Sequence, residues 1–281
     1  FACGTLTAGL TFGILLGSLV ATLINTSMTP QAIAETGWRI PFFLGGIFGL
    51  LAMYLRRWLQ ETPVFREMQA RKQLSDALPL KTVLANHKQG VIVSMLLTWL
   101  LSACIVVVIL MAPTLLQKQH GIAAATALQA NSLATVMLIV GCIVAGLLVD
   151  RFGVAKILAA GSVLLAICSW SFFQSMAAAP EYLFIAYAIT GFSIGVVGVV
   201  PVVMVRAFPA EVRFSGISFS YNLSYAIFGG LTPISVSLMM TLTPMAPAWY
   251  VLALAVMGLL LGLWLAGERR QQSVLGAVSA R

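Results

Sequence analysis

The sequence predicts an all-α, polytopic membrane protein with eight transmembrane helices. The first observation is composition: 60% of the 281 residues are hydrophobic and only 9% are charged, whereas soluble domains are about 25% charged. The second is the recurrence of apolar stretches of about twenty residues, the helical length that crosses a hydrocarbon core of about 30 Å. The third is that no Asp, Glu, Lys or Arg lies near the centre of any stretch. The expected spans are residues 5–25, 40–58, 90–115, 130–149, 156–177, 182–205, 216–240 and 248–266.

The lysines and arginines fall almost entirely into alternate connections between these spans, with Arg39 and Lys118 as the exceptions. Because short cytoplasmic loops carry the excess of Lys and Arg, the rich connections and both ends of the chain are expected to face the cytoplasm. Membrane topology therefore accounts for the net charge of +8, and no nucleic-acid partner is expected. The residues assigned to the cytoplasmic side are Arg56, Arg57, Arg66, Arg71, Lys72, Lys81, Lys88, Arg151, Lys156, Arg206, Arg213, Arg269, Arg270 and Arg281.

The first span carries Gly9, Gly13 and Gly17, three glycines four residues apart. On a helix they form one stripe, which lets a neighbouring backbone approach closely. In lipid, where apolar burial barely favours one helix contact over another, such close packing is a common means of association. We therefore expect this glycine stripe to serve helix packing.

The long connection between the second and third spans, residues 56 to 90, is expected to be cytoplasmic. Thr62-Pro63 fits a helix start with Thr at the N-cap and Pro at the first helical position. Leu78-Pro79 begins a second short helix that runs to about Asn86. We expect short amphipathic helices along the membrane surface that link two helical bundles; a solvated loop that only fixes topology is the alternative.

Four stretches of the sequence carry a family resemblance that covers nearly the whole chain. They are GWRIPF at 37–42, RRWLQETPVF at 56–65, GLLVDRFG at 146–153 and FPAEVRFSG at 208–216. In this order and at this spacing, the chain resembles the metabolite:proton symporter family of the major facilitator superfamily.

That resemblance implies a major-facilitator-type fold of twelve spans in two six-helix halves. The eight spans of this chain would then correspond to helices five to twelve, so the missing N-terminal helices of the same protein are expected as a partner. The resemblance also implies the bacterial cytoplasmic (inner) membrane as the location. The implied organisation is the last two helices of the N-terminal bundle at 1–58, a cytoplasmic linker with short helices at 59–89, a six-helix C-terminal bundle at 90–267 and a cytoplasmic tail at 268–281.

Polar residues line one face of the seventh span, where Ser218, Asn222 and Tyr225 fall at i, i+4 and i+7. We call these three residues the polar stripe. Unpaired polar groups in lipid cost several kcal/mol, so the stripe must face protein or a watery cavity. The two interpretations, a wall of a substrate cavity and hydrogen bonding between helices, are about equally supported. Trp99 and Asn131 are weaker candidates for the same cavity, and for them hydrogen bonding between helices is the favoured alternative.

The stretch GLLVDRFG places Asp150 and Arg151 between two apolar runs, with Gly153 allowing a sharp turn. An acidic side chain at a helix C-terminus is locally unfavourable, because that end is partly negative. The carboxylate of Asp150 is stabilised if it points at the N-terminus of a neighbouring helix, such as the start of the seventh span. An arginine on the same side, such as Arg206 or Arg213, would stabilise it in the same way. The superfamily resemblance implies that this loop is a cytoplasmic latch; a loop whose charges only fix topology is the alternative.

The chain offers no motif for enzymatic chemistry: it contains no HExxH, P-loop or paired carboxylates, and its four cysteines form no CxxC pair. We therefore expect no enzyme, metal or bound cofactor. The predicted function is a secondary active transporter that couples a proton to a small organic metabolite, a carboxylate or betaine-like solute. The alternative is a truncated membrane fragment that transports nothing and acts, if at all, as a helix-packing scaffold. No acidic or basic side chain lies at membrane depth, so the proton-coupling group is expected in the absent part.

Overall fold

The computed structural model describes residues 1–58 and 79–279, and within them every regular element is a helix. Eight helical stretches are long and apolar enough to cross a membrane, as predicted. The predicted helix at Thr62-Pro63 lies outside the described residues. The spans in chain order are α1 Ala2–Ser27; η1 Gly37–Arg39 with α3 Ile40–Arg56; α6 Lys88–Cys104, η2 Ile105–Met111 and α7 Ala112–His120; α8 Ala124–Phe152; α9 Val154–Ala178; α10 Leu183–Ile194, η4 Gly195–Val199 and α11 Val200–Ala207; α12 Arg213–Ser224, η5 Tyr225–Gly229 and α13 Gly230–Met240; and α14 Ala246–Ser279.

Short elements close the connections between these spans. Helix α2 (Pro30–Glu35) is capped by Thr29, whose side chain accepts a hydrogen bond from the amide of Ala32. Gly153 takes a φ of 88° between α8 and α9, which confirms the predicted sharp turn. The last helix, α14, continues through residues 268–279, which the sequence assigns to a cytoplasmic tail.

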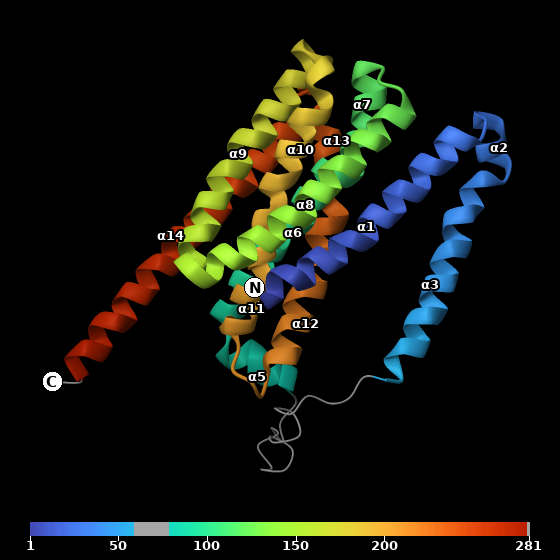
Figure 1. Ribbon diagram of the computed structural model, residues 1–281. Helices are drawn as coiled ribbons and strands as arrows, with labels where there is room; N and C mark the ends of the chain where they lie inside the picture. The colour runs from blue at the N-terminus through green and yellow to red at the C-terminus, as the bar shows by residue number, and fades with distance from the viewer. Residues whose placement is uncertain (59–78, 280–281) are drawn as a thin grey trace.

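Helix α5 (Pro79–Asn86) is the second of the two short helices predicted in the connection. Its Val83 is fully buried and belongs to a small apolar cluster with Val91, Phe208 and Val212. The helix therefore packs against one end of the bundle, at the bottom of Figure 1.

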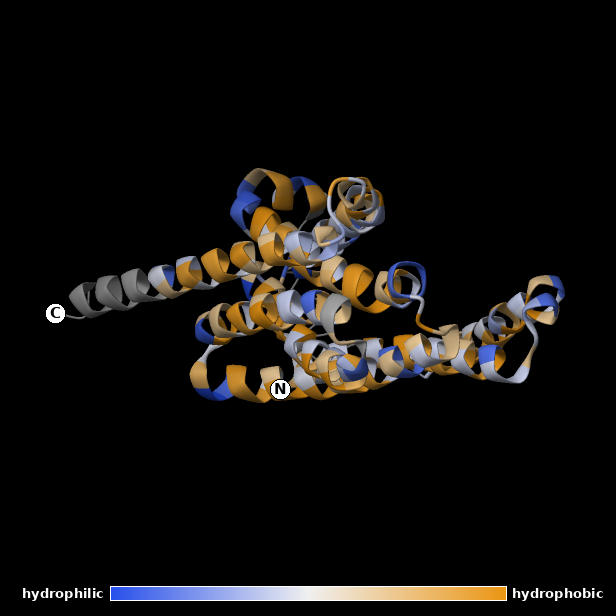
Figure 2. Ribbon diagram, turned by 90° about the horizontal axis from the view of Figure 1, so that it is seen from above, coloured by the Kyte–Doolittle hydropathy of each residue, from blue (hydrophilic) through white to orange (hydrophobic). Residues whose placement is uncertain are grey.

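The six spans from α6 to α14 form one bundle with a continuous apolar core, and α1 lies along α8 at its side (Figure 1). Helix α3 stands apart from the bundle and has no buried residue. Figure 2 shows hydrophobic residues along the helices and hydrophilic residues mainly near their ends, which is the pattern of membrane spans.

Helix α8 is approached closely on two sides by small residues. A Cβ added at Gly191 or Gly195 would overlap the backbone of Ala134 or Gly141, so α10 and η4 lie directly against α8. On another side, a Cβ at Gly4 of α1 would lie 2.9 Å from the Cα of Gly146. These contacts are the close helix approaches that small residues permit in lipid.

The predicted glycine stripe is not among these contacts. A Cβ at Gly9, Gly13 or Gly17 would meet no atom within 4 Å in the described chain. Helix α1 packs on α8 with another face instead, that of Gly4, Thr7, Ala8, Thr11, Leu15 and Ser18, which are its buried residues together with Ile24. Any packing role of the glycine stripe must therefore involve a partner beyond the described residues.

Three spans are interrupted by segments that are not α-helical. Segments η2 in the third span and η5 in the seventh are π-helical, and η4 in the sixth is a 3₁₀ helix. Pro113, Pro201 and Pro233 follow these segments closely. Proline cannot donate a backbone hydrogen bond, so it frees a carbonyl one turn earlier and favours such breaks.

We expect Gly191→Ala and Gly195→Ala to lower stability, because each added methyl group must displace the backbone of α8. Overpacking of this kind costs about 1–3 kcal/mol. The measurement is the thermal unfolding midpoint of the purified protein in detergent. Gly9→Ala and Gly13→Ala are the matched controls, since both positions face open space. Equal loss in the two pairs would contradict the assignment of the packing faces.

Candidate functional site

The polar stripe lies on a half-buried to exposed face of α12 and η5. Asn222 is exposed, and its Nδ2 donates to the carbonyl of Ser218 on its own helix over 2.8 Å. The hydrogen bond between α12 and α6 is made by a different residue, Ser224, whose hydroxyl donates to the carbonyl of Met95 over 2.7 Å. The stripe is therefore the open face of this helix, and a neighbouring face carries the contact with α6.

Aromatic rings flank the polar stripe. Tyr225 is half-buried and packs on Tyr221 with ring centroids 4.9 Å apart. Trp99 of α6 stacks on Phe228 of η5 at 4.2 Å and an interplanar angle of 11°. With a rise of 1.5 Å per residue, Trp99 and Asn222 lie roughly 13–17 Å from the starts of their helices, which is near mid-depth in a membrane.

A chain of hydrogen bonds holds Trp99 in this position. Its Nε1–H donates to the hydroxyl of Tyr250 on α14, and that hydroxyl lies 3.1 Å from the hydroxyl of Thr232. Thr232 in turn donates to the carbonyl of Phe228 over 2.6 Å. Because the hydrogen of Thr232 is used there, Tyr250 is the donor to Thr232. The chain thus begins and ends on the two stacked residues, and sequence spacing gave no sign of Tyr250 or Thr232.

Asn131 does not lie on this open face. Its side chain is only 5% exposed and contacts the hydroxyls of Ser18 and Tyr187 at 3.3 Å and 2.6 Å. Tyr187 is fully buried, and its hydroxyl also donates to the carbonyl of Val108 over 2.5 Å. The structure therefore places Asn131 between helices, in agreement with the alternative favoured from the sequence, and its partners Ser18 and Tyr187 are the part that the sequence did not indicate.

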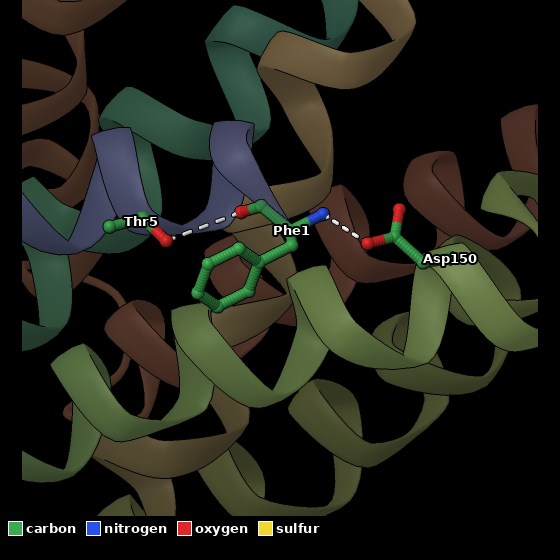
Figure 3. Close-up of polar contacts among 3 residues, drawn as sticks. All are labelled: Phe1, Thr5 and Asp150. Atoms are coloured by element: carbon green, nitrogen blue, oxygen red, sulfur yellow. Dashed lines mark hydrogen bonds and ion pairs between the residues drawn. The ribbon is translucent and has the colours of Figure 1, made fainter.

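The carboxylate of Asp150 lies beside the start of α1. Its Oδ2 is 2.5 Å from the backbone nitrogen of Phe1 (Figure 3). Both residues are more than half exposed. The contact shows that Asp150 faces the start of the first span.

The other residues of the predicted latch are engaged elsewhere. The guanidinium of Arg151 lies 5.3 Å from the ring centroid of Phe152, and Nε of Arg213 donates to the carbonyl of Phe208 over 3.1 Å. Arg206 lines a cavity of about 420 Å³ at the same end of the bundle, together with Glu268. The structure therefore does not bring Asp150 together with Arg206 or Arg213.

The described residues hold no charged group in the core: the buried polar side chains are those of Ser, Thr and Asn. Among the same residues, no cluster of His, Cys, Asp or Glu has a geometry that could hold a metal ion. Chemically, the described part of the chain can offer a ligand neutral hydrogen bonds and aromatic rings at mid-depth.

Eight apolar helices, three of them interrupted, with a polar stripe at mid-depth, define a multi-pass membrane protein. Residues 1–233 match the Major Facilitator Superfamily, so the chain belongs to this superfamily, in agreement with the resemblance noted in its sequence.

Individual relatives are transporters. The chain is 31% identical over 243 residues to a citrate-proton symporter of Klebsiella pneumoniae, covering 84% of this chain and 54% of that protein. It is 29% identical over 290 residues to the glycine betaine/proline/ectoine/pipecolic acid transporter OusA of Dickeya dadantii (strain 3937), covering 95% and 56%. The chain thus spans about half the length of these relatives. None of them is an enzyme by name, which agrees with the expectation for this chain.

A solved structure shares the fold. The proton:xylose symporter XylE superposes with a TM-score of 0.67 at 19% identity, over 94% of this chain and 63% of that one. At this identity the likeness shows the major-facilitator-type architecture and nothing about the substrate.

The positions of Asp150 and Arg213 predict the result of a charge exchange. Asp150→Arg and Arg213→Asp each remove a separate contact. The loss of stability in the double variant should therefore equal the sum of the losses in the two single variants. The measurement is the unfolding midpoint of the four proteins in detergent. Recovery of stability in the double variant would show direct pairing, as a latch between these two residues requires.

Proposed function

We propose that this chain is part of a secondary active transporter that carries a small organic metabolite together with a proton. Transport proceeds by alternating access, in which two helical halves rock about a site near the membrane midplane. The protein resides in the bacterial cytoplasmic membrane, with the lysine- and arginine-rich connections facing the cytoplasm.

The observation that carries this proposal is the exposed amide of Asn222 at mid-depth of a membrane span. Exposing an amide side chain to lipid at this depth costs free energy. The same amide is stable where water or a polar ligand can hydrogen-bond to it. The half-buried Tyr225 extends the polar stripe one turn further, towards the stacked pair of Trp99 and Phe228. This face is therefore proposed as one wall of the substrate cavity.

The proposed substrate class is a carboxylate or a betaine-like solute, in keeping with the names of the relatives. Aromatic faces attract quaternary ammonium groups, and the stripe itself carries hydroxyl and amide groups but no basic side chain. The described wall thus favours a zwitterion, whereas a multiply charged anion would need cationic groups from elsewhere in the protein.

The proton-coupling group is proposed to lie outside this chain, in further spans that complete the N-terminal half. Support comes from the uncharged core of the described residues and from α3, which has no buried residue. The open glycine stripe of α1 offers a face on which such spans could pack closely.

Replacing Asn222 tests the cavity wall. We expect Asn222→Ala to raise the KM for uptake by about tenfold in the full-length transporter, the effect of losing about 1.4 kcal/mol of binding. The unfolding midpoint should stay unchanged, because the amide bonds only to its own helix. Asn25→Ala is the matched control: Asn25 is also exposed and donates to the carbonyl four residues earlier. An unchanged KM for Asn222→Ala would remove Asn222 from the cavity wall.

Uptake by the 281-residue chain itself separates the proposal from its alternative. Proteoliposomes with an imposed pH gradient are tested for uptake of citrate and of glycine betaine, with the chain alone and with a full-length transporter that contains it. We expect gradient-driven uptake only in the full-length protein. Uptake by the chain alone would contradict an external coupling group, and no uptake by either would favour a transport-inactive scaffold.

A further inference from the structure

The π-helical segment of the third span leaves one carbonyl in need of a donor. In a π-helix, each carbonyl accepts from the amide five residues later. For Val108 in η2 that residue is Pro113, which has no N–H. The hydroxyl of Tyr187 lies 2.5 Å from this carbonyl, so a side chain of α10 supplies the missing hydrogen bond.

The rings around Tyr187 fix the position of this hydroxyl. Tyr187 is fully buried, and its ring stacks on Phe172 of α9 with centroids 4.6 Å apart and an interplanar angle of 25°. This packing therefore fixes the hydroxyl oxygen of Tyr187 against the interrupted part of the third span.

The number of hydrogens available decides which side chain donates in each hydrogen bond around Tyr187. The Tyr187 hydroxyl has one hydrogen, yet two oxygens lie within 2.6 Å, the Val108 carbonyl and Oδ1 of Asn131. Turning the Asn131 amide by 180° about its Cβ–Cγ bond lets Nδ2 donate to Tyr187, whose own hydrogen goes to Val108. Oδ1 then faces the hydroxyl of Ser18 and accepts from it, so each hydrogen bond between Ser18, Asn131, Tyr187 and Val108 has one donor and one acceptor.

Ser18 connects this group to α1. Its hydroxyl lies 3.3 Å from the Asn131 amide and 2.9 Å from the hydroxyl of Ser132, and all three side chains are buried. Ser132 can also donate to the carbonyl of Leu128, which lies on its own helix. Of the two partners of Ser18, Asn131 is the one that contacts Tyr187, so the link from α1 to Tyr187 runs through Asn131. The hydrogen bonds thus form one path from α1 through α8 and α10 to η2.

We propose that Asn131 and Tyr187 are positioning residues that couple the placement of α1 to the π-helical break η2. When α1 moves relative to α8, Ser18 leaves Asn131, the Asn131 amide is free to turn, and Tyr187 loses the donor that orients its hydroxyl towards Val108. In a transporter whose halves rock, this path would report the position of the N-terminal half to the third span, a consequence that rests on the proposed function.

The seventh span provides the control. Phe228 also lies five residues before a proline, Pro233, and its carbonyl accepts a hydrogen bond from the hydroxyl of Thr232, which lies 3.1 Å from the hydroxyl of Tyr250. This chain of hydrogen bonds ends on Trp99 and includes no residue of α1. Thr232→Val therefore removes the donating hydroxyl at the other π-helical break without touching the path to α1.

Amide hydrogen exchange of the purified chain in detergent, followed by mass spectrometry, tests the coupling. We expect Tyr187→Phe to speed exchange in residues 105–116 about tenfold, since it leaves a buried carbonyl without a donor. Ser18→Ala should speed exchange in the same residues about threefold, and the double variant should match Tyr187→Phe alone, since both changes act on one path. Thr232→Val, which removes the donor to the Phe228 carbonyl, should speed exchange in residues 225–236 and leave 105–116 unchanged.

The coupling is overturned if Ser18→Ala leaves residues 105–116 unchanged, or if the two changes multiply in the double variant. The exchange experiment needs no transport, so it decides this question even where uptake fails. In a full-length protein that transports, Tyr187→Phe should lower the maximal rate and leave KM unchanged, because the tyrosine does not touch the substrate. A raised KM with an unchanged rate would assign Tyr187 to binding instead.

Discussion

The constraint that governs this structure is that a polar group inside hydrocarbon must find its partner within the protein. Most backbone groups meet it by forming helices, but three spans are interrupted near prolines that cannot donate. At Val108 the missing donor is a tyrosine of another span, and at Phe228 it is a nearby threonine. The side chains that satisfy these carbonyls also tie distant helices together, so a local defect in one helix determines contacts across the bundle.

The spans and their order could be predicted from the sequence because their cause is local. A run of about twenty apolar residues is helical in a membrane whatever its neighbours are, since the helix satisfies its own backbone. The turn at Gly153 was equally local, as was the helix at Pro79–Asn86. The family motifs added the likeness to the major facilitator superfamily, which the matched residues confirm.

The candidate site was less predictable, because its partners are far apart in the chain. Tyr187 contacts Asn131 and Val108 at separations of 56 and 79 residues, and nothing in its local sequence points to either. For Asn131 the sequence left a cavity wall and hydrogen bonding between helices open, and it could not name the partners, Ser18 and Tyr187. The packing role of the glycine stripe stays a prediction, because the close contact of α1 in the described chain uses Gly4 on another face.

Helix α3 has a consequence for how this protein is made. None of its residues is buried, so tertiary packing within the described chain contributes little to its helical form. Its hydropathy is sufficient by itself for insertion as a span. The six-helix bundle, by contrast, needs its neighbours in place before the carbonyl of Val108 can meet Tyr187. Insertion and assembly are therefore separable steps here, and a bundle mutation can spoil the second while leaving the first intact.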